Sequence, residues 1–277
     1  MITAYLNGTY LPLEQASVPA MDRGFLFSDG VYEIIPVYQG RPFRLTEHLT
    51  RLKNSLHAIQ LDVTFDPTII TELLNRNGGG DQYIYIQITR GPAPKRDFCF
   101  PDTVKPTIFV YTQPYSHPTI EKLQQGASAI TLPDIRWELC HIKSISLLGS
   151  VLQRRKATEA GVDEGILMRD GHVSEGTSSN VFIVKQGVII TPPKSLHMLG
   201  GITREVILAI AEQQKMPYRE AEIPETDLYT ADEIWITSAV RTIVPVLSLN
   251  KKHVGDGKPG TVWQKMITHY RAAHEHT

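Results

Sequence analysis

One lysine lies in an unusually apolar stretch of the sequence. Lys143 stands within Cys140-His-Ile-Lys-Ser-Ile-Ser-Leu-Leu-Gly149, just before a helix expected from about residue 146 to residue 160. Burial there would favour the neutral amine, and a neutral amine is what condensation with a carbonyl group requires. A lysine whose aliphatic stem only passes apolar neighbours on its way to solvent gives the same pattern. This segment alone therefore leaves both interpretations open.

A carboxylate occurs among small hydroxyl residues further along the chain. Glu175 lies in Val173-Ser-Glu-Gly-Thr-Ser-Ser-Asn180, which we interpret as a turn leading into an apolar strand at residues 180–184. A carboxylate in such a place could pair with a protonated ring nitrogen, which would then withdraw electrons from a reacting carbon. The same residues are also typical of an ordinary polar turn.

Three further segments offer groups that bind anions. Gly200-Gly201-Ile202-Thr203 opens a helix expected at residues 203–214, and the N-terminus of a helix attracts phosphate through its free N–H groups and positive dipole. Ser238 follows a strand expected at residues 233–237 and adds a hydroxyl donor. Arg51 lies on a helix that Thr46 can cap. Each segment also has a purely structural interpretation, as a tight connection, a strand end or a solvated arginine.

The charge balance excludes a general attraction for large anions. The 277 residues include 28 Lys and Arg against 29 Asp and Glu, which gives a formal net charge of −1. Such a chain creates no basic field, so neither nucleic acid nor an anionic membrane is an expected partner. Any charged ligand must be bound at a local site.

Cysteine content and hydropathy narrow the class further. Cys99 and Cys140 are too few for a disulfide framework or a four-sulfur zinc site, and we expect no metal centre. The N-terminal residues do not read as a signal peptide, and no apolar run approaches the roughly 20 residues that span a bilayer. These features predict a cytoplasmic protein. The dinucleotide, P-loop, Gly-x-Ser-x-Gly and His-Glu-x-x-His motifs are absent from the sequence.

The elements that must position these residues are strands interspersed with helices. The first part predicts a hairpin around Asn7-Gly8, helices from Thr46 and from Asp66-Pro67, and strands at residues 31–38, 83–89 and 106–111. The second part predicts strands at residues 127–132, 165–168, 180–184, 188–191, 233–237 and 244–249, with helices at 146–160, 203–214 and 261–273. We therefore expect an α+β protein with a small N-terminal α/β domain at residues 1–115, a linker at 116–126, and a larger strand-rich domain at 127–277.

Five segments together resemble the fold-type IV pyridoxal-phosphate enzymes, the class IV aminotransferase family, and most closely its D-amino-acid aminotransferases. The resemblance runs from about residue 20 to residue 260, with the segments in the family's order. The segments are Asp22-Arg-Gly-Phe-Leu-Phe-Ser-Asp-Gly-Val-Tyr-Glu33, Glu47-His-Leu-Thr-Arg-Leu52, Asp134-Ile-Arg-Trp-Glu-Leu-Cys-His-Ile-Lys-Ser144, Glu175-Gly-Thr-Ser-Ser-Asn-Val181 and Gly201-Ile-Thr-Arg204.

The resemblance implies a role for individual residues. Lys143 corresponds to the lysine that bonds to pyridoxal 5'-phosphate and moves a proton between the substrate Cα and the cofactor, and Glu175 to the partner of the pyridine nitrogen. Leu199 corresponds to a side chain that packs on the cofactor ring. The phosphate-binding positions correspond to Arg51, Ile202, Thr203, Ser238 and Ala239, the last of which lacks the hydroxyl that close relatives often have.

The match is weaker where the substrate carboxylate would bind. In D-amino-acid aminotransferases a tyrosine, an arginine and a histidine two residues later bind this group. Tyr32 corresponds to the tyrosine and Arg96 to the arginine, but Phe98 stands at the histidine position. Asp97, beside the arginine, is expected to weaken its field.

The resemblance implies a homodimer in which the loop carrying Arg96 comes from the partner subunit. The implied reaction transfers the amino group of D-amino acids such as D-alanine to 2-oxo acids such as pyruvate or 2-oxoglutarate. A 4-amino-4-deoxychorismate lyase, which releases pyruvate and 4-aminobenzoate, is an alternative that Phe98 keeps open. A branched-chain L-aminotransferase and a non-catalytic carrier of the cofactor are further alternatives.

Overall fold

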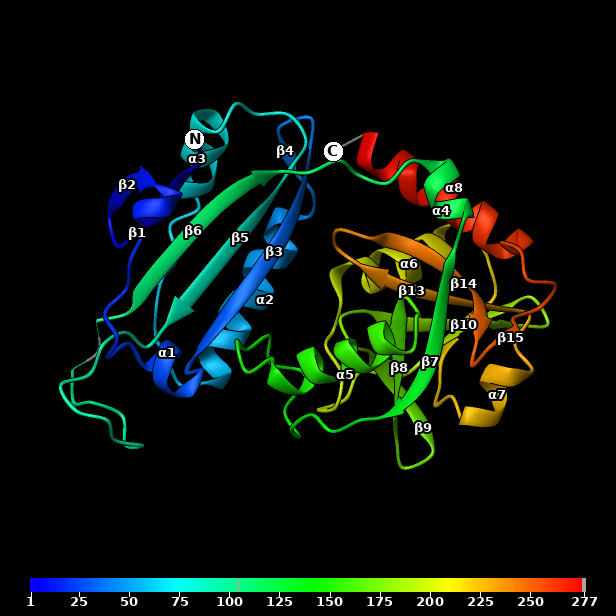
Figure 1. The fold of residues 1–277 in the computed structure, drawn as a ribbon. Coiled ribbons are helices and arrows are strands. Elements are labelled where there is room, and N and C mark those ends of the chain that lie inside the picture. Colours follow the sequence, from blue (N-terminus) through cyan, green and yellow to red (C-terminus); the bar gives the residue numbers. More distant parts are fainter. Residues whose placement is uncertain (104, 276–277) are drawn as a thin grey trace. The chain divides into compact units, whose positions relative to one another are not determined.

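The chain folds into two compact units, which are described separately. The computed structural model describes residues 1–103 and 105–275 (Figure 1). One unit comprises Met1–Ser116 with Ile142–Ser146, and the other His117–His141 with Leu147–Thr277. Lys143 thus lies in a short excursion of the chain into the first unit. The linker predicted at residues 116–126 contains a short helix, α4 (Ile120–Gln124), and its role as a domain boundary stays a prediction.

An antiparallel sheet forms the centre of the first unit. In the described part of the chain it has six strands in the order β2-β1-β6-β5-β3-β4 (Figure 1). Asn7 and Gly8 have φ angles of 49° and 95°, so the predicted hairpin turn is present between the first two strands. The strands are β1 (Thr3–Leu6), β2 (Thr9–Pro12), β3 (Gly30–Tyr38), β4 (Arg41–Pro42), β5 (Gln82–Thr89) and β6 (Thr107–Pro114).

Two longer helices pack on this sheet, α2 on strand β3 and α3 on strands β1 and β6. Leu52 and Leu56 of α2 (Leu45–Ala58) are buried in one cluster with Ile35 and Ile84. The helix begins one residue before the predicted start, and its N-cap is Arg44 without a side-chain cap, so the expected capping role of Thr46 is wrong. The helices of this unit are η1 (Leu13–Gln15), α1 (Arg23–Phe27), α2 (Leu45–Ala58) and α3 (Thr68–Arg76).

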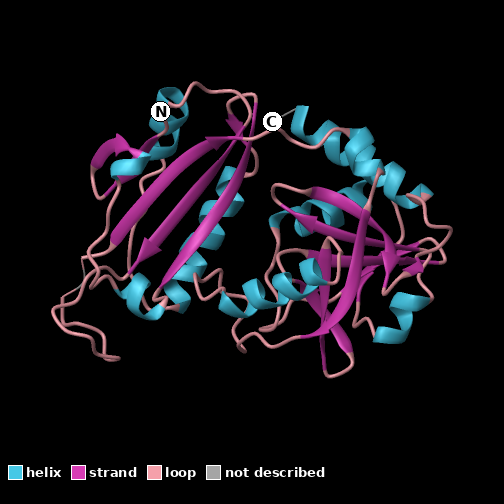
Figure 2. Cartoon of the chain, viewed as in Figure 1, coloured by secondary structure: helices cyan, strands magenta, loops and turns pink. Residues whose placement is uncertain are grey.

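The second unit is built on a larger mixed sheet. Counted over the described residues it has nine strands in the order β12-β11-β10-β13-β14-β7-β8-β9, with β15 paired to β14. Figure 2 draws the strands in magenta. The pairs β11–β12, β14–β7 and β7–β8 are parallel. The strands are β7 (Ala127–Pro133), β8 (Glu164–Arg169), β9 (His172–Gly176), β10 (Asn180–Lys185), β11 (Val188–Thr191), β12 (Tyr218–Glu220), β13 (Glu233–Ser238), β14 (Thr242–Leu249) and β15 (Lys252–His253).

Two helices, α6 and α8, bury apolar side chains against strand β13 of this sheet and against each other. The terminal helix buries Trp263, Met266, Ile267 and Tyr270, and the helix that starts at residue 202 buries Val206 and Ile207 among others. Besides α4, the helices are α5 (Leu148–Glu159), α6 (Ile202–Gln213), α7 (Glu225–Tyr229) and α8 (Thr261–Glu275). No helix within residues 1–103 and 105–275 is long and apolar enough to cross a membrane.

The segment around Glu175 differs from its prediction. Residues 172–176 form the strand β9, which pairs antiparallel with β8, whereas the sequence predicts a turn over residues 173–179. In the strand, the backbone N–H and C=O groups of these residues form hydrogen bonds with β8, which a turn would not provide. Glu175 is therefore fixed by a sheet.

Candidate active site

Backbone hydrogen bonds attach the Lys143 segment to strand β3. The carbonyl oxygen of Lys143 accepts from the N–H of Tyr32 at 2.9 Å, and its own N–H donates to Ser55 Oγ at 3.2 Å. Ser144 forms a β-bridge with Val31. These bonds fix the backbone on both sides of Lys143, so the sheet sets the direction in which its side chain leaves.

The Lys143 amine lies over an aromatic ring. Its Nζ is 4.2 Å from the ring centroid of Tyr32, and that ring stacks on Tyr85 with 5.9 Å between centroids. The face of an aromatic ring attracts an ammonium group. Lys143 and Tyr32, which the sequence selects for different roles, are brought together.

The opposite face of β3 carries a buried carboxylate between two basic side chains. Glu33 follows Tyr32 in the strand, and consecutive residues of a strand point to opposite faces. Its Oε1 accepts from Arg51 Nε at 2.7 Å and its Oε2 from Arg51 Nη2 at 2.8 Å. His48 Nδ1 lies 2.9 Å from Oε2. His48 and Arg51 are three residues apart on α2, which places both on the face that covers β3.

Charge determines the protonation of this cluster. Burial raises the pKa of Glu33, but Arg51 and His48 outweigh burial and lower that pKa to about 2. Burial lowers the pKa of His48. The carboxylate is thus ionised at neutral pH. Arg51, predicted to bind phosphate, has a protein carboxylate as partner for two of its nitrogens, and its phosphate role stays a prediction.

Glu175 accepts three hydrogen bonds inside the second unit. Its Oε2 accepts from the N–H of Leu199 at 3.1 Å and from Asn180 Nδ2 at 3.2 Å. Its Oε1 accepts from Arg136 Nη1. Asn180 also donates to the carbonyl oxygen of Leu199 at 2.8 Å, so the predicted residues Glu175 and Leu199 are linked twice. Burial raises the pKa of Glu175, and Arg136 opposes that shift.

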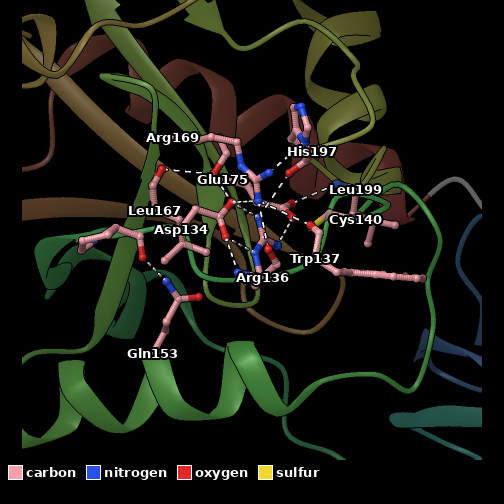
Figure 3. Close-up of polar contacts among 12 residues, drawn as sticks. Asp134, Arg136, Trp137, Cys140, Gln153, Leu167, Arg169, Glu175, His197 and Leu199 are labelled. Carbon is pink, nitrogen blue, oxygen red and sulfur yellow. Dashed lines mark hydrogen bonds and ion pairs between the residues drawn. The ribbon is translucent and has the colours of Figure 1, made fainter. Parts of the chain in front are cut away.

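Arg136 is a residue of this cluster whose role the sequence did not predict. Figure 3 shows it between Asp134 and Glu175. Its Nε and Nη2 donate to the two carboxylate oxygens of Asp134, each at 2.9 Å. Burial raises the pKa of Asp134, but Arg136 and Ser174 outweigh it and lower that pKa to about 2. Asp134-Ile-Arg136 belongs to one of the segments that resemble the family, so the sequence does draw attention to Arg136. The distance of 39 residues between Arg136 and Glu175 along the chain, however, gives no indication that they are in contact.

A second arginine orders the chain around Arg136. Arg169 donates to the carbonyl oxygen of Arg136 at 3.2 Å and contacts His197 Nδ1 at 3.2 Å (Figure 3). It also donates to Glu138 Oε1 at 3.1 Å. Arg136 itself donates to the carbonyl oxygen of His197 at 3.2 Å. The network ties residues 134–138 to residues 197–199, the two segments that surround Glu175.

The predicted phosphate-binding residues of the second unit lie at a helix start and a strand end. Ile202 and Thr203 are the first residues of α6, after Gly201, which caps the helix without a side-chain hydrogen bond. The first N–H groups of a helix have no partner within it and suit an anion. Ser238 ends β13, and its Oγ accepts from the N–H of Arg241 at 3.2 Å. Ala239 follows it directly.

One buried carboxylate connects this strand end with the chain after Glu175. Glu164 has no exposed surface. It accepts from Arg241 Nη1 at 2.8 Å, from Ser179 Oγ at 3.3 Å, and from Thr177 Oγ1. The sequence did not select Glu164, because an acidic residue at the start of a strand has no distinctive pattern.

The predicted carboxylate-binding residues are not brought into contact with each other. The guanidinium carbon of Arg96 lies 4.9 Å from the ring centroid of Phe27 and 5.7 Å from that of Phe98. Asp97 pairs with Lys95 at 2.9 Å. Tyr32, as described above, contacts Lys143.

Comparison with known proteins identifies a matching family and close relatives of this chain. Residues 30–249 match the family described as amino-transferase class IV. The chain is 40% identical to the D-alanine aminotransferase of Bacillus licheniformis, over 95% of this chain and 93% of the relative. It is 40% identical to the D-alanine aminotransferase of Staphylococcus epidermidis, over 96% of this chain and 95% of the relative.

Solved structures share the fold. The branched-chain amino acid aminotransferase of Escherichia coli superposes with a TM-score of 0.91 at 27% identity, over 98% of this chain and 94% of that chain. The branched-chain aminotransferase of the archaeon Thermoproteus uzoniensis, solved with norvaline, gives a TM-score of 0.86 at 26% identity, over 98% and 93%. Another branched-chain amino acid aminotransferase, with a TM-score of 0.88 at 26% identity, was solved with pyridoxamine 5'-phosphate.

Proposed function

This chain belongs to the class IV aminotransferase family, and from that premise we propose that it transfers the amino group of D-alanine and similar D-amino acids to 2-oxo acids. The observation that carries the proposal is its 40% identity, over nearly the full length, to enzymes named for D-alanine. The solved branched-chain aminotransferases are similar in fold but share only 26–27% of the sequence. The relation therefore favours D-alanine over branched-chain substrates.

The residues present fit pyridoxal 5'-phosphate as the cofactor. Lys143 offers a primary amine for an aldehyde, and the start of α6 at Ile202 and Thr203 offers N–H groups for a phosphate. Glu175 uses three of the about four acceptor sites of a carboxylate, which leaves one for a protonated ring nitrogen. We propose that Arg51, Ser238 and the backbone at Ala239 also bind the phosphate, and that Leu199 packs on the ring.

The chemistry divides between the cofactor and the chain. When bound, the cofactor supplies a carbonyl carbon for the amine and a ring that stabilises negative charge on Cα. Lys143 Nζ would hold the cofactor, and as a free amine it would accept the proton from the substrate Cα. Glu175 keeps the ring nitrogen protonated. Arg136, which contacts the Glu175 carboxylate, opposes the rise in its pKa that burial causes and so favours the ionised form.

The substrate carboxylate is the remaining charge to be bound. We propose that Arg96 binds it through two parallel N–H donors, a geometry that a guanidinium matches well. Tyr32 can add its phenol. The position of Phe98 means that no imidazole contributes, so the guanidinium carries most of this recognition.

We also propose that the protein acts as a homodimer. Helix α5 exposes an apolar stripe at Leu148, Val151 and Leu152, which are 70%, 58% and 49% exposed and lie at helical spacings of three and four. An apolar stripe of this kind suits an interface. A cytoplasmic location stays a prediction.

One experiment tests the function. The holoenzyme is mixed separately with D-alanine, L-alanine, an L-branched amino acid or aminodeoxychorismate in the absence of a 2-oxo acid. Conversion of bound pyridoxal phosphate to pyridoxamine phosphate is followed by absorbance, and released pyruvate is measured. We expect conversion and one equivalent of pyruvate per site with D-alanine only. Conversion by L-branched amino acids alone, or pyruvate release from aminodeoxychorismate without either alanine reacting, would refute the proposal and identify the alternative enzyme.

A further inference from the structure

A buried guanidinium fixes the loop that follows Arg96. Arg23 is 3% exposed, and it donates through Nη1 to the carbonyl oxygens of Asp97 at 2.6 Å and Cys99 at 3.2 Å. Its Nη2 donates to the carbonyl oxygen of Phe98 at 3.3 Å. Three consecutive carbonyl groups of one loop therefore converge on one side chain.

A second arginine fixes the other side of this cluster. Asp29 Oδ2 accepts from Arg23 Nε and from Arg90 Nε, each at 2.8 Å. Arg90 donates further to the carbonyl oxygens of Ile59 at 2.6 Å and Gln60 at 3.2 Å. Two buried cations share one carboxylate, so the loop carbonyls supply the acceptors that Arg23 lacks. Buried donors left without acceptors are costly, which favours the docked loop.

Two aromatic rings, Phe27 and the exposed Phe98, lie near the guanidinium of Arg96. Phe27 lies 4.8 Å from the guanidinium carbon of Arg23 and 4.9 Å from that of Arg96. Phe98 packs on Phe27 with 5.4 Å between centroids. Over the described residues, no carboxylate pairs with Arg96. A guanidinium that lies over rings leaves its in-plane N–H donors for a ligand.

We propose that Arg23 is a positioning residue for substrate binding: it fixes the backbone of residues 97–99 so that Phe98 and Phe27 orient Arg96 toward the substrate carboxylate. Phe98 thus replaces the absent histidine by packing. The inference rests on the proposed function for the role of Arg96, whereas the attachment of the loop to Arg23 does not depend on it.

The test separates these two parts. Arg23→Gln removes the cation and most donors, and Arg23→Lys keeps the charge but offers a point donor in place of the planar fork. The rate of limited trypsin digestion of the holoenzyme measures how firmly the loop is held, because Lys95 and Arg96 are exposed cleavage sites within it. The KM for D-alanine, from steady-state kinetics, measures the effect on substrate binding. Arg76→Gln, a change in an exposed i,i+4 pair with Glu72, is the matched control.

We expect Arg23→Gln to raise the cleavage rate after Lys95 and Arg96 about tenfold and the KM for D-alanine by a similar factor, with kcat within about threefold. Arg23→Lys should lie between Arg23→Gln and the wild type, and it replaces Arg23→Gln should that variant not fold. An unchanged cleavage rate in both variants overturns the proposal. Faster cleavage with an unchanged KM overturns the link to substrate. Absence of any reaction with D-alanine in the wild type refutes the proposed function, while the digestion still tests the loop.

Discussion

Two buried glutamates, one in each unit, have different surroundings, and this difference sets their chemistry. Glu33 contacts Arg51 through both oxygens and His48 through one, and its pKa is lowered to about 2. Glu175 contacts one arginine together with a backbone N–H and an amide, and burial raises its pKa. Glu33 is therefore a fixed anion, whereas Glu175 retains acceptor capacity for a ligand.

Glu175→Gln tests the role of the second carboxylate. An amide cannot keep a ring nitrogen protonated, so we expect kcat with D-alanine to fall on the order of 100-fold while cofactor affinity changes much less. The primary isotope effect with Cα-deuterated D-alanine should increase, because proton removal becomes slower. Loss of cofactor affinity with little change in the isotope effect would assign Glu175 to binding alone.

Glu33→Gln tests the first carboxylate through stability. Removing one partner of a buried ion pair costs on the order of 3 to 5 kcal/mol, and denaturant titration at pH 7 measures it. The folded pKa of about 2 lies below the ordinary value of 4.5, so the contribution of Glu33 is complete above pH 4.5 and is lost as the pH falls toward 2. The variant should show a flatter loss of stability over this range. An equally steep loss would contradict the assignment.

At the scale of elements, the start of helix α6 lies close to the hydrogen-bonded cluster around Glu175. The N-terminus of α6 depends on Gly201, because a Cβ there would lie 1.9 Å from Asn180 Oδ1. Asn180 in turn donates to Glu175 and to the carbonyl oxygen of Leu199. The glycine therefore allows the helix start and the Glu175 cluster to approach each other.

Gly201→Ala and Gly200→Ala form a matched pair that tests this close approach. No atom lies within 4 Å of a Cβ added at Gly200. We expect Gly201→Ala to weaken pyridoxal phosphate binding about tenfold or more and to lower the melting temperature by several degrees, and Gly200→Ala to have a smaller effect on both. Fluorescence titration of the apoenzyme and calorimetry give the two values. Equal effects of the two variants would show that the contact with Asn180 does not matter.

The sequence predicted most strands and the longer helices, since their apolar periodicity reflects the same burial that the structure shows. Short elements such as α1 (Arg23–Phe27) and α4 (Ile120–Gln124) carry too few residues for a period to be visible. The strand β9 was missed because its polar, hydroxyl-rich residues show no apolar alternation, although it pairs with the neighbouring strand β8 across the turn at Asp170 and Gly171. Arg136, Glu164 and Arg23 were not selected because their roles arise from contacts distant in sequence.

At the scale of the whole molecule, the distribution of charge and of exposed apolar residues determines which ligands and partners the protein can bind. The formal net charge of −1 leaves local groups to bind charged ligands, and the structure shows such groups paired within each unit, as in Glu33 with Arg51 and Asp134 with Arg136. The apolar stripe on α5 is the feature that supports association.

Val151→Glu tests association through that stripe. A charge at a half-exposed apolar position should not disturb the helix, whose interior residues at this point are Gln153 and Ala157. We expect the dimer dissociation constant, measured by sedimentation, to rise at least tenfold. The melting temperature of the isolated subunit should not change. Lys156→Glu on the same helix is the control. A wild-type protein that sediments as a monomer would contradict the homodimer.

The identity of the lysine that binds the cofactor tests the central claim most directly. The holoenzyme is reduced with borohydride, digested, and the modified peptide identified by mass spectrometry. We expect the pyridoxyl mass on Lys143, at one per chain, and we expect prior incubation with D-alanine, but not with L-alanine, to prevent the labelling. Labelling at another lysine, or undiminished labelling of a Lys143→Ala variant, would contradict it.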